Sequence, residues 1–165
     1  MSSPSIGSPS TNRVGTRRAN STSRQARDRR SNSSAQTALS YSEQGLKVKH
    51  PDGTVLQVTG IRFGSDRIVV GLSVVNRSPR TVTLNTNRQD LVLIDNLGNQ
   101  YDVIPLIDNP KVEVPPYGTL NGQFAFATQL DSKATSLTLI ANRRSGSLSK
   151  TATAPRIIVN LPMSK

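Results

Sequence analysis

The chain has 165 residues, no cysteine, a single histidine and a net charge of +11. The lack of cysteine excludes disulfides, thiolate metal sites and cysteine nucleophiles, and one histidine leaves little from which to build a transition-metal site. The positive charge points to polyanions as partners, and a chain of this length is expected to hold one domain.

The first 40 residues carry a disproportionate part of this charge. They hold seven arginines against one acidic residue, Asp28, and few bulky apolar side chains. Such a segment cannot bury enough apolar surface to offset the entropy of ordering its backbone. We therefore expect a disordered Arg/Ser-rich arm over residues 1–40 and a folded domain over residues 41–165. The arginines of the arm are Arg13, Arg17, Arg18, Arg24, Arg27, Arg29 and Arg30.

The N-terminus lacks an apolar run of the kind that a secretory signal needs, and no stretch of the chain approaches the length of a transmembrane helix. These features predict a soluble protein without a secretory signal, and they favour a cytoplasmic location over the envelope. The Ser- and Arg-rich, acid-poor composition of residues 1–36 also resembles that of an organellar transit peptide, which would be cleaved.

Beyond residue 40 the chain consists of short β-branched runs separated by turn residues. The run RIVVGLSVVN alternates cleanly, so that Ile68, Val70, Leu72 and Val74 would share one face of a strand. Similar runs recur about every 8–12 residues, a pattern typical of an antiparallel sandwich or barrel of roughly eight or nine strands. The other runs are TVLQVTGIRF, TVTLN, DLVLID, GQFAFAT, SLTLIAN and PRIIVNLP.

Glycines and prolines mark the ends and irregularities of these runs. A change of face at Gly60 predicts a β-bulge. The segment DNLGN predicts a hairpin in which Gly98 has a positive φ, and PDGT at 51–54 predicts a tight turn. The prolines of VPPYG donate no backbone hydrogen bond, so residues 114–118 are expected to cross between sheets rather than to form a central strand.

Three motifs resemble the immunoglobulin-like domains of unknown function found in bacterial envelope proteins and lipoproteins. Members of that group read V-x-N-x-S after a strand, then L-x-D-x-x-G-x-x-Y, then a marked turn followed by G-x-x-x-F. The matching segments are Val74 to Ser78, Leu93 to Tyr101 and Tyr117 to Phe126, within residues 54–140. The resemblance implies an all-β, immunoglobulin-like antiparallel β-sandwich, and the family has no catalytic residues to carry over. The signal peptide and lipidated cysteine that usually accompany such domains are not expected here.

Candidate catalytic and metal sites are few in the body of the chain. His50 lies beside a turn, where we expect an exposed side chain rather than a catalytic base or a metal ligand. Asp90, Asp95, Asp102 and Asp108 gather around one hairpin region, and oxygen-rich loops can hold Ca²⁺. Their spacing matches no calcium loop, however, and aspartate at turns has a backbone role. We therefore expect no enzyme, no cofactor and no metal, with a cation at the hairpin of Asp95 and Asp102 as the alternative.

The arm is the segment most directly connected with function. Seven arginines on a flexible chain can each contact a phosphate and release counterions. Because the arm has no aromatic residue, we expect this binding to have no sequence specificity. The loop NRRSGSLSK adds Arg143 and Arg144 as polyanion contacts. The sequence therefore predicts a non-enzymatic binding or assembly protein, in which the sandwich docks a protein partner or another copy and the arm contacts nucleic acid or another polyanion.

Two other functions stay open at the level of the sequence. A basic arm on a small β-sandwich is also the layout of small viral coat or shell-forming proteins, whose arms neutralise packaged nucleic acid. The second alternative is an organelle-targeted β-sandwich with a cleavable N-terminal transit peptide. Both alternatives keep the sandwich and differ in what the arm does.

Overall fold

The computed structural model describes residues 37–40 and 46–163. Among these residues there is no helix, and hence none that could cross a membrane. Of the predicted arm, residues 1–40, residues 1–36 lie outside the described residues. The described part of the chain belongs to one compact unit, Gln36–Lys165.

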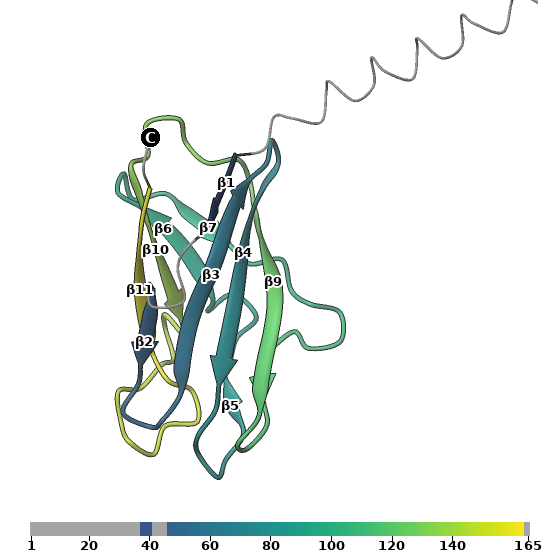
Figure 1. Ribbon diagram of the computed structural model, residues 1–165, viewed down its shortest axis with the longest axis vertical. Helices are drawn as coiled ribbons and strands as arrows, with labels where there is room; N and C mark the ends of the chain where they lie inside the picture. The colour runs from purple at the N-terminus through teal and green to yellow at the C-terminus, as the bar shows by residue number, and fades with distance from the viewer. Residues whose placement is uncertain (1–36, 41–45, 164–165) are drawn as a thin grey trace, which may run out of the picture. The chain divides into compact units, whose positions relative to one another are not determined.

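The described residues form eleven strands, all paired antiparallel (Figure 1). The first sheet contains β1 (Thr37–Ser40), β2 (Lys47–Lys49), β3 (Val55–Phe63), β4 (Arg67–Val75) and β9 (Thr119–Ala127). The second contains β6 (Val92–Asp95), β7 (Gln100–Asp102), β10 (Ser136–Ala141) and β11 (Ile157–Pro162). A short ribbon pairs β5 (Val82–Thr83) with β8 (Glu113–Val114). The strand order is β1-β3-β4-β9 in the first sheet, with β2 also paired to β3, and β11-β10-β6-β7 in the second.

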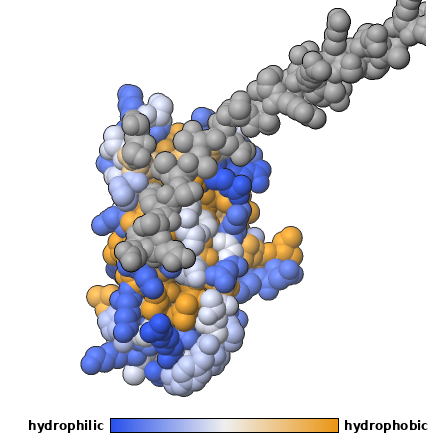
Figure 2. Space-filling model, viewed as in Figure 1, coloured by the Kyte–Doolittle hydropathy of each residue, from blue (hydrophilic) through white to orange (hydrophobic). Residues whose placement is uncertain are grey.

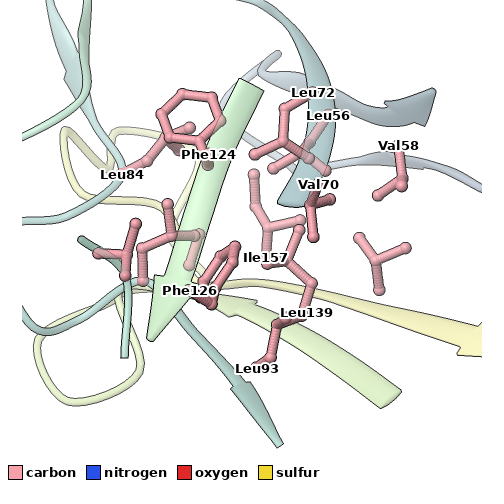
Figure 3. Close-up of a cluster of buried hydrophobic side chains, with 14 of the residues drawn as sticks. Leu56, Val58, Val70, Leu72, Leu84, Leu93, Phe124, Phe126, Leu139 and Ile157 are labelled. Atoms are coloured by element: carbon pink, nitrogen blue, oxygen red, sulfur yellow. The ribbon is translucent and has the colours of Figure 1, made fainter. Parts of the chain in front are cut away.

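The two larger sheets face each other and enclose one apolar core. Phe124 and Phe126 enter it from β9, while Leu93 and Leu139 enter from the opposite sheet (Figure 3). All four side chains are fully buried. Burying a side chain of this size stabilises the fold by about 1.5–3 kcal/mol relative to leaving it exposed, so the core supplies the rigidity on which the loops depend.

Several expectations from the sequence are confirmed. The fold is all-β and antiparallel, and the register between β3 and β4 shifts between Val58 and Gly60, at the predicted bulge. The bulge brings Thr59 over the neighbouring strand, where a Cβ added to Gly71 would lie 2.5 Å from the hydroxyl oxygen of Thr59. Gly98 has a φ of 93° in the hairpin between β6 and β7, as predicted.

Two features differ from the expectation. There are eleven strands where the sequence predicts eight or nine. None of the predicted runs covers β8, which has only two residues and is too short to show alternation, or β1, which lies in the segment assigned to the arm. Residues 37–40 were assigned to the arm, but they form β1 and pair with β3 from Phe63 to Gly60. This pairing is made by backbone groups along the edge of β3, and composition gives no sign of it. The folded domain therefore begins before residue 41.

Candidate polyanion-binding surface

Four loops meet at one end of the sandwich, the lower end in Figure 1, which we call the loop end. Contacts between residues far apart in sequence connect them. The Nε2 atom of His50 lies 2.8 Å from the carbonyl oxygen of Ser147. The backbone N–H of Tyr117 donates to the carbonyl oxygen of Ser78 at 3.2 Å. The loops of this end are 49–54, counted from the last residue of β2, and 76–81, 115–118 and 142–156.

Asn76 connects two of these loops from inside the fold. Its side chain is fully buried. The Nδ2 group donates to the carbonyl oxygens of Arg80 at 2.7 Å and of Val114 and Pro115 at 3.0 Å each. The Oδ1 atom accepts a hydrogen bond of 2.9 Å from the backbone N–H of Ser78. The side-chain amide of Asn76 binds backbone groups of both loops, so the V-x-N-x-S motif fixes the geometry of these loops.

The longest loop of this end, 142–156, is held by two buried polar side chains. Asn142 has a φ of 51° and donates from Nδ2 to two backbone carbonyl oxygens, at 2.6 and 2.9 Å. The carboxylate of Asp90 is fully buried. It accepts from the backbone N–H of Arg144 at 3.2 Å and from the hydroxyl of Ser145. Both side chains bind backbone or loop groups, so the path of the loop is set by the protein itself.

His50 is buried, with a relative exposure of 3%, and the exposed side chain expected from the sequence is wrong. Its Nδ1 atom lies 2.9 Å from the carboxylate of Asp52, and that carboxylate also accepts from Thr54 N–H at 2.8 Å. The physical reason is that the 50–54 turn folds against the 142–156 loop, where Ser147 offers its carbonyl oxygen. His50 therefore connects two loops and presents no base to solvent.

The side chains exposed at the loop end are strongly basic. Within its four loops the one acidic residue is Asp52, and it is buried. Six cations are exposed, and none of them pairs with a carboxylate among the described residues. In Figure 2 the lower end of the molecule is mainly hydrophilic in colour. We call these six residues the basic cluster: Lys49, Arg77, Arg80, Arg144, Lys150 and Arg156.

The two contacts predicted in the body differ in their surroundings. Arg144 is exposed and belongs to the basic cluster. Arg143 is half-buried, and its guanidinium donates to the side-chain oxygen of Gln100 on β7, across the second sheet. Its side chain is therefore directed away from the loop end. The arm contacts lie outside the described residues and stay predictions: Arg13, Arg17, Arg18, Arg24, Arg27, Arg29 and Arg30.

The acidic hairpin has its hydrogen-bond acceptors occupied. One carboxylate oxygen of Asp95 accepts from the N–H groups of Leu97 and Asn99, both at 2.9 Å. The other accepts from the Asn99 side chain and from the Tyr101 hydroxyl, both at 2.8 Å. Among residues 37–40 and 46–163 no three His, Cys, Asp or Glu side chains are grouped so as to hold a metal ion. Asp95 therefore shapes the hairpin turn, and Asp102 stands exposed beside it.

Asp95 gives the fold a defined pH dependence. Burial raises the pKa of Asp95, but the hydrogen bonds from Asn99, Tyr101 and Leu97 together outweigh it, and its pKa lies below the usual value. A carboxylate of this kind stabilises the fold above its unfolded pKa, and the stabilisation is lost as the pH falls through the folded pKa. We expect Asp95→Asn to lower the free energy of unfolding by about 1–2 kcal/mol at neutral pH. The difference should shrink below about pH 4, near the pKa of a free aspartate.

Urea unfolding of the parent chain and of Asp95→Asn over an acidic to neutral pH series measures this effect. Two stability curves that converge in acid are expected. Curves that stay parallel down to the lowest pH would contradict the expectation. The stability difference would then come from the altered hydrogen bonds of the side chain and not from the charge of Asp95.

A shallow hollow of about 400 Å³ lies at the opposite end of the sandwich, at the turn between β3 and β4. Its one carboxylate, Asp66, pairs with Arg67 at 2.8 Å, and the hydrogen bonds from Arg67 lower the pKa of Asp66. The hollow therefore has no second acid, no histidine and no unpaired carboxylate in its lining. The lining residues are Arg62, Gly64, Ser65, Asp66, Arg67 and Val69.

Comparison with known proteins assigns no family to the chain. No family model matches it, and no curated protein matches its sequence. Among solved structures, the chain is similar to the crystal structure of a conserved hypothetical protein from Bacillus anthracis. The two are 11% identical, with a TM-score of 0.45, over 66% of this chain and 93% of the other. The function is therefore inferred from the geometry and charge of the loop end.

Proposed function

We propose that the chain is a non-enzymatic binding protein, whose basic cluster and arm contact a polyanion without reading its sequence. The observation that carries the proposal is the separation of charge at the loop end. The cations there are exposed, while the neighbouring acids Asp52 and Asp90 are buried and hydrogen-bonded to the protein. Cations that form no ion pair with a carboxylate keep their positive potential for an incoming polyanion.

The expected strength of this binding depends steeply on salt. Each phosphate that is neutralised lowers the slope of log K against log salt by about 0.7 on a single strand and 0.9 on a duplex. Full engagement of the basic cluster would contribute a slope of roughly −4 to −5, and the seven arginines of the arm would contribute roughly −5 to −6. Sulfated or phosphorylated polymers therefore suit the surface, and a small anion does not.

The placement of the basic cluster can be tested by removing equal charge from the two ends of β4. We expect Arg77→Ala with Arg80→Ala to weaken heparin binding roughly 10-fold and to make the salt slope shallower by about 1.5. The matched control is Arg62→Ala with Arg67→Ala, about 30 Å away at the other end of the strand. Affinity chromatography on heparin and fluorescence titration measure both variants.

The control pair should change the affinity by less than about two-fold, since long-range attraction is screened at physiological salt. If the two double variants lose affinity equally, binding follows total charge and the loop end is not the site. If neither the variants nor the parent chain binds heparin at low salt, the proposed function fails altogether.

The strand order supports an immunoglobulin-like assignment for the sandwich. Immunoglobulin sandwiches place strands A, B and E together in one sheet, and G, F, C and C′ in the other. The orders β3-β4-β9 and β11-β10-β6-β7 follow the same scheme when β3 is taken as strand A. The relation to the immunoglobulin-like domains of bacterial envelope proteins rests on the sequence motifs, with this order as additional support.

The use of the polar groups supports a non-enzymatic body. Among the described residues, His50, Asp90 and Asp95 are buried groups of the kind used for acid–base chemistry. Each is buried and hydrogen-bonded to backbone groups of its own or a neighbouring loop. A general acid or base needs to reach a substrate proton, and these three groups are turned toward the protein.

Docking of a protein partner is the second part of the proposed function, and an exposed apolar loop favours it. The loop between β7 and β8 projects to the right in Figure 1 and has an orange tip in Figure 2. Ile107 in this loop is 97% exposed and Ile104 is 42% exposed. Hydrogen bonds fix the two ends of this loop. Ile104 N–H donates to the carbonyl oxygen of Ala125, and the side-chain amide of Asn85 donates to the carbonyl oxygen of Pro110. A fixed apolar tip loses little entropy when it enters a partner's pocket.

A further inference from the structure

Tyr117 occupies a backbone position that is unfavourable for a tyrosine. It follows two prolines in a tight turn, which is closed by the hydrogen bond of 2.9 Å from Gly118 N–H to the carbonyl oxygen of Pro115. Its φ is 55°, in the left-handed region where a Cβ is crowded and glycine or asparagine is favoured. Tyr117 is 71% exposed, so burial of the side chain does not offset the strain. An exposed aromatic kept in a strained position indicates a functional site.

The turn of Tyr117 is joined to the basic loop 76–81. Tyr117 N–H donates to the carbonyl oxygen of Ser78, and Asn76 N–H donates to that of Gly118 at 2.9 Å. Arg77 and Arg80 flank Ser78 in the chain and are both exposed. Neither arginine pairs with a carboxylate of the described residues. The turn that carries the ring is therefore bound directly to the loop that carries these two exposed arginines.

We propose that Tyr117 is a stacking platform for an unpaired base of a single-stranded nucleic acid, with Arg77 and Arg80 on the adjoining phosphates. Aromatic rings next to cations in a groove or turn are the usual means of binding single strands without reading their sequence, because every base has a π-face. The bases of a duplex are already stacked on one another, so a duplex offers this ring no partner. A sulfated polysaccharide has no base at all. The site thus favours single strands among the polyanions.

This inference rests on the proposed polyanion binding and makes it more specific. Tyr117 carries no positive charge, so it has no part in the phosphate contacts of the basic cluster and the arm. The two claims therefore fail separately: loss of phosphate contacts affects every polyanion, whereas loss of stacking affects only those that carry bases.

The test compares two probes of the same length and charge on the full-length chain. One is an oligo(dT) of about 15 nucleotides, within the usual range of single-strand site sizes, and the other is an abasic oligomer with the same number of phosphates. We expect the parent chain to bind oligo(dT) more tightly by about five-fold or more, the contribution of one stacked base. We expect Tyr117→Gly to remove this preference and to leave binding of the abasic oligomer unchanged, while Tyr117→Phe retains it.

Tyr117→Gly also separates binding from folding. Because glycine adopts the left-handed backbone without strain, the melting temperature of this variant should stay the same or rise, by about 2–4 °C. Tyr117→Asn, which also tolerates this backbone, is a second variant that should lose the same preference.

Equal affinity of the parent chain for the two probes overturns the stacking site and leaves polyanion binding standing. Unchanged oligo(dT) binding by Tyr117→Gly and Tyr117→Asn overturns it too, and would assign the exposed ring to a protein contact instead. Failure of the parent chain to bind either probe overturns both claims together.

Discussion

A chain that carries Asn76→Ala is expected to lose about 3 kcal/mol or more of its free energy of unfolding. The substitution leaves the carbonyl oxygens of Arg80, Val114 and Pro115 and the N–H of Ser78 without the partner that the asparagine provides. Two of these carbonyl oxygens keep another donor, since that of Arg80 also accepts from the Ser78 hydroxyl and that of Pro115 from Gly118 N–H. The Ser78 N–H and the Val114 carbonyl oxygen lose the asparagine, and a buried polar group without a partner costs about 1–3 kcal/mol. Urea unfolding monitored by circular dichroism measures the loss.

Two further variants make the result for Asn76 specific. Asn76→Asp keeps the acceptor for Ser78 but turns a carboxylate oxygen toward three carbonyl oxygens, so it should destabilise at least as much as alanine. Asn121→Ala, at an exposed position of β9, is the matched control and should change stability by less than about 0.5 kcal/mol. An Asn76→Ala variant as stable as the control would show that the loop end holds its shape without this side chain.

A full-length chain in which all seven arginines of the arm are replaced by serine is expected to bind polyanions about 1000-fold more weakly at moderate salt. Its salt slope should be shallower by about 5, since each phosphate contact on a single strand contributes about 0.7. Serine keeps the length and polarity of the arm, so that only the charge changes. The substituted residues are Arg13, Arg17, Arg18, Arg24, Arg27, Arg29 and Arg30.

Fluorescence anisotropy with a labelled oligonucleotide over a salt series measures both quantities. A control chain without residues 1–35 keeps the compact unit that begins at Gln36, and it should bind like the serine variant. A serine variant that binds like the parent chain would exclude the arm as a polyanion contact. The basic cluster would then carry the binding alone.

The apolar alternation of the strands was a reliable guide to the sandwich. Ile68, Val70, Leu72 and Val74 are all buried on one face of β4, as the period of two predicts. The bulge at Gly60 and the hairpin glycine were predictable for a local reason, because each depends on the conformation of one residue. By contrast β8 pairs with β5 across about 30 residues in sequence, and β1 pairs with β3 through backbone groups.

The candidate site was only partly predictable, because its shape depends on contacts between loops far apart in sequence. His50 looks like a turn residue until Ser147, 97 positions later, accepts its hydrogen bond. Arg143 and Arg144 are neighbours of the same type, and only the position of Gln100 directs one of them away from the loop end. Tyr117 could have been noticed, since the third residue of a Pro-Pro-Tyr-Gly turn is where a positive φ is common.

Binding at the loop end is tested most directly by an NMR titration of the isotope-labelled full-length chain with oligo(dT). Backbone amide shifts report which loops meet the ligand, whatever the affinity. Among the described residues, we expect the largest changes in the loops 49–54, 76–81, 115–118 and 142–156. Changes confined to the opposite end, around Arg62 and Arg67, or no change at all on addition of excess ligand, would contradict it.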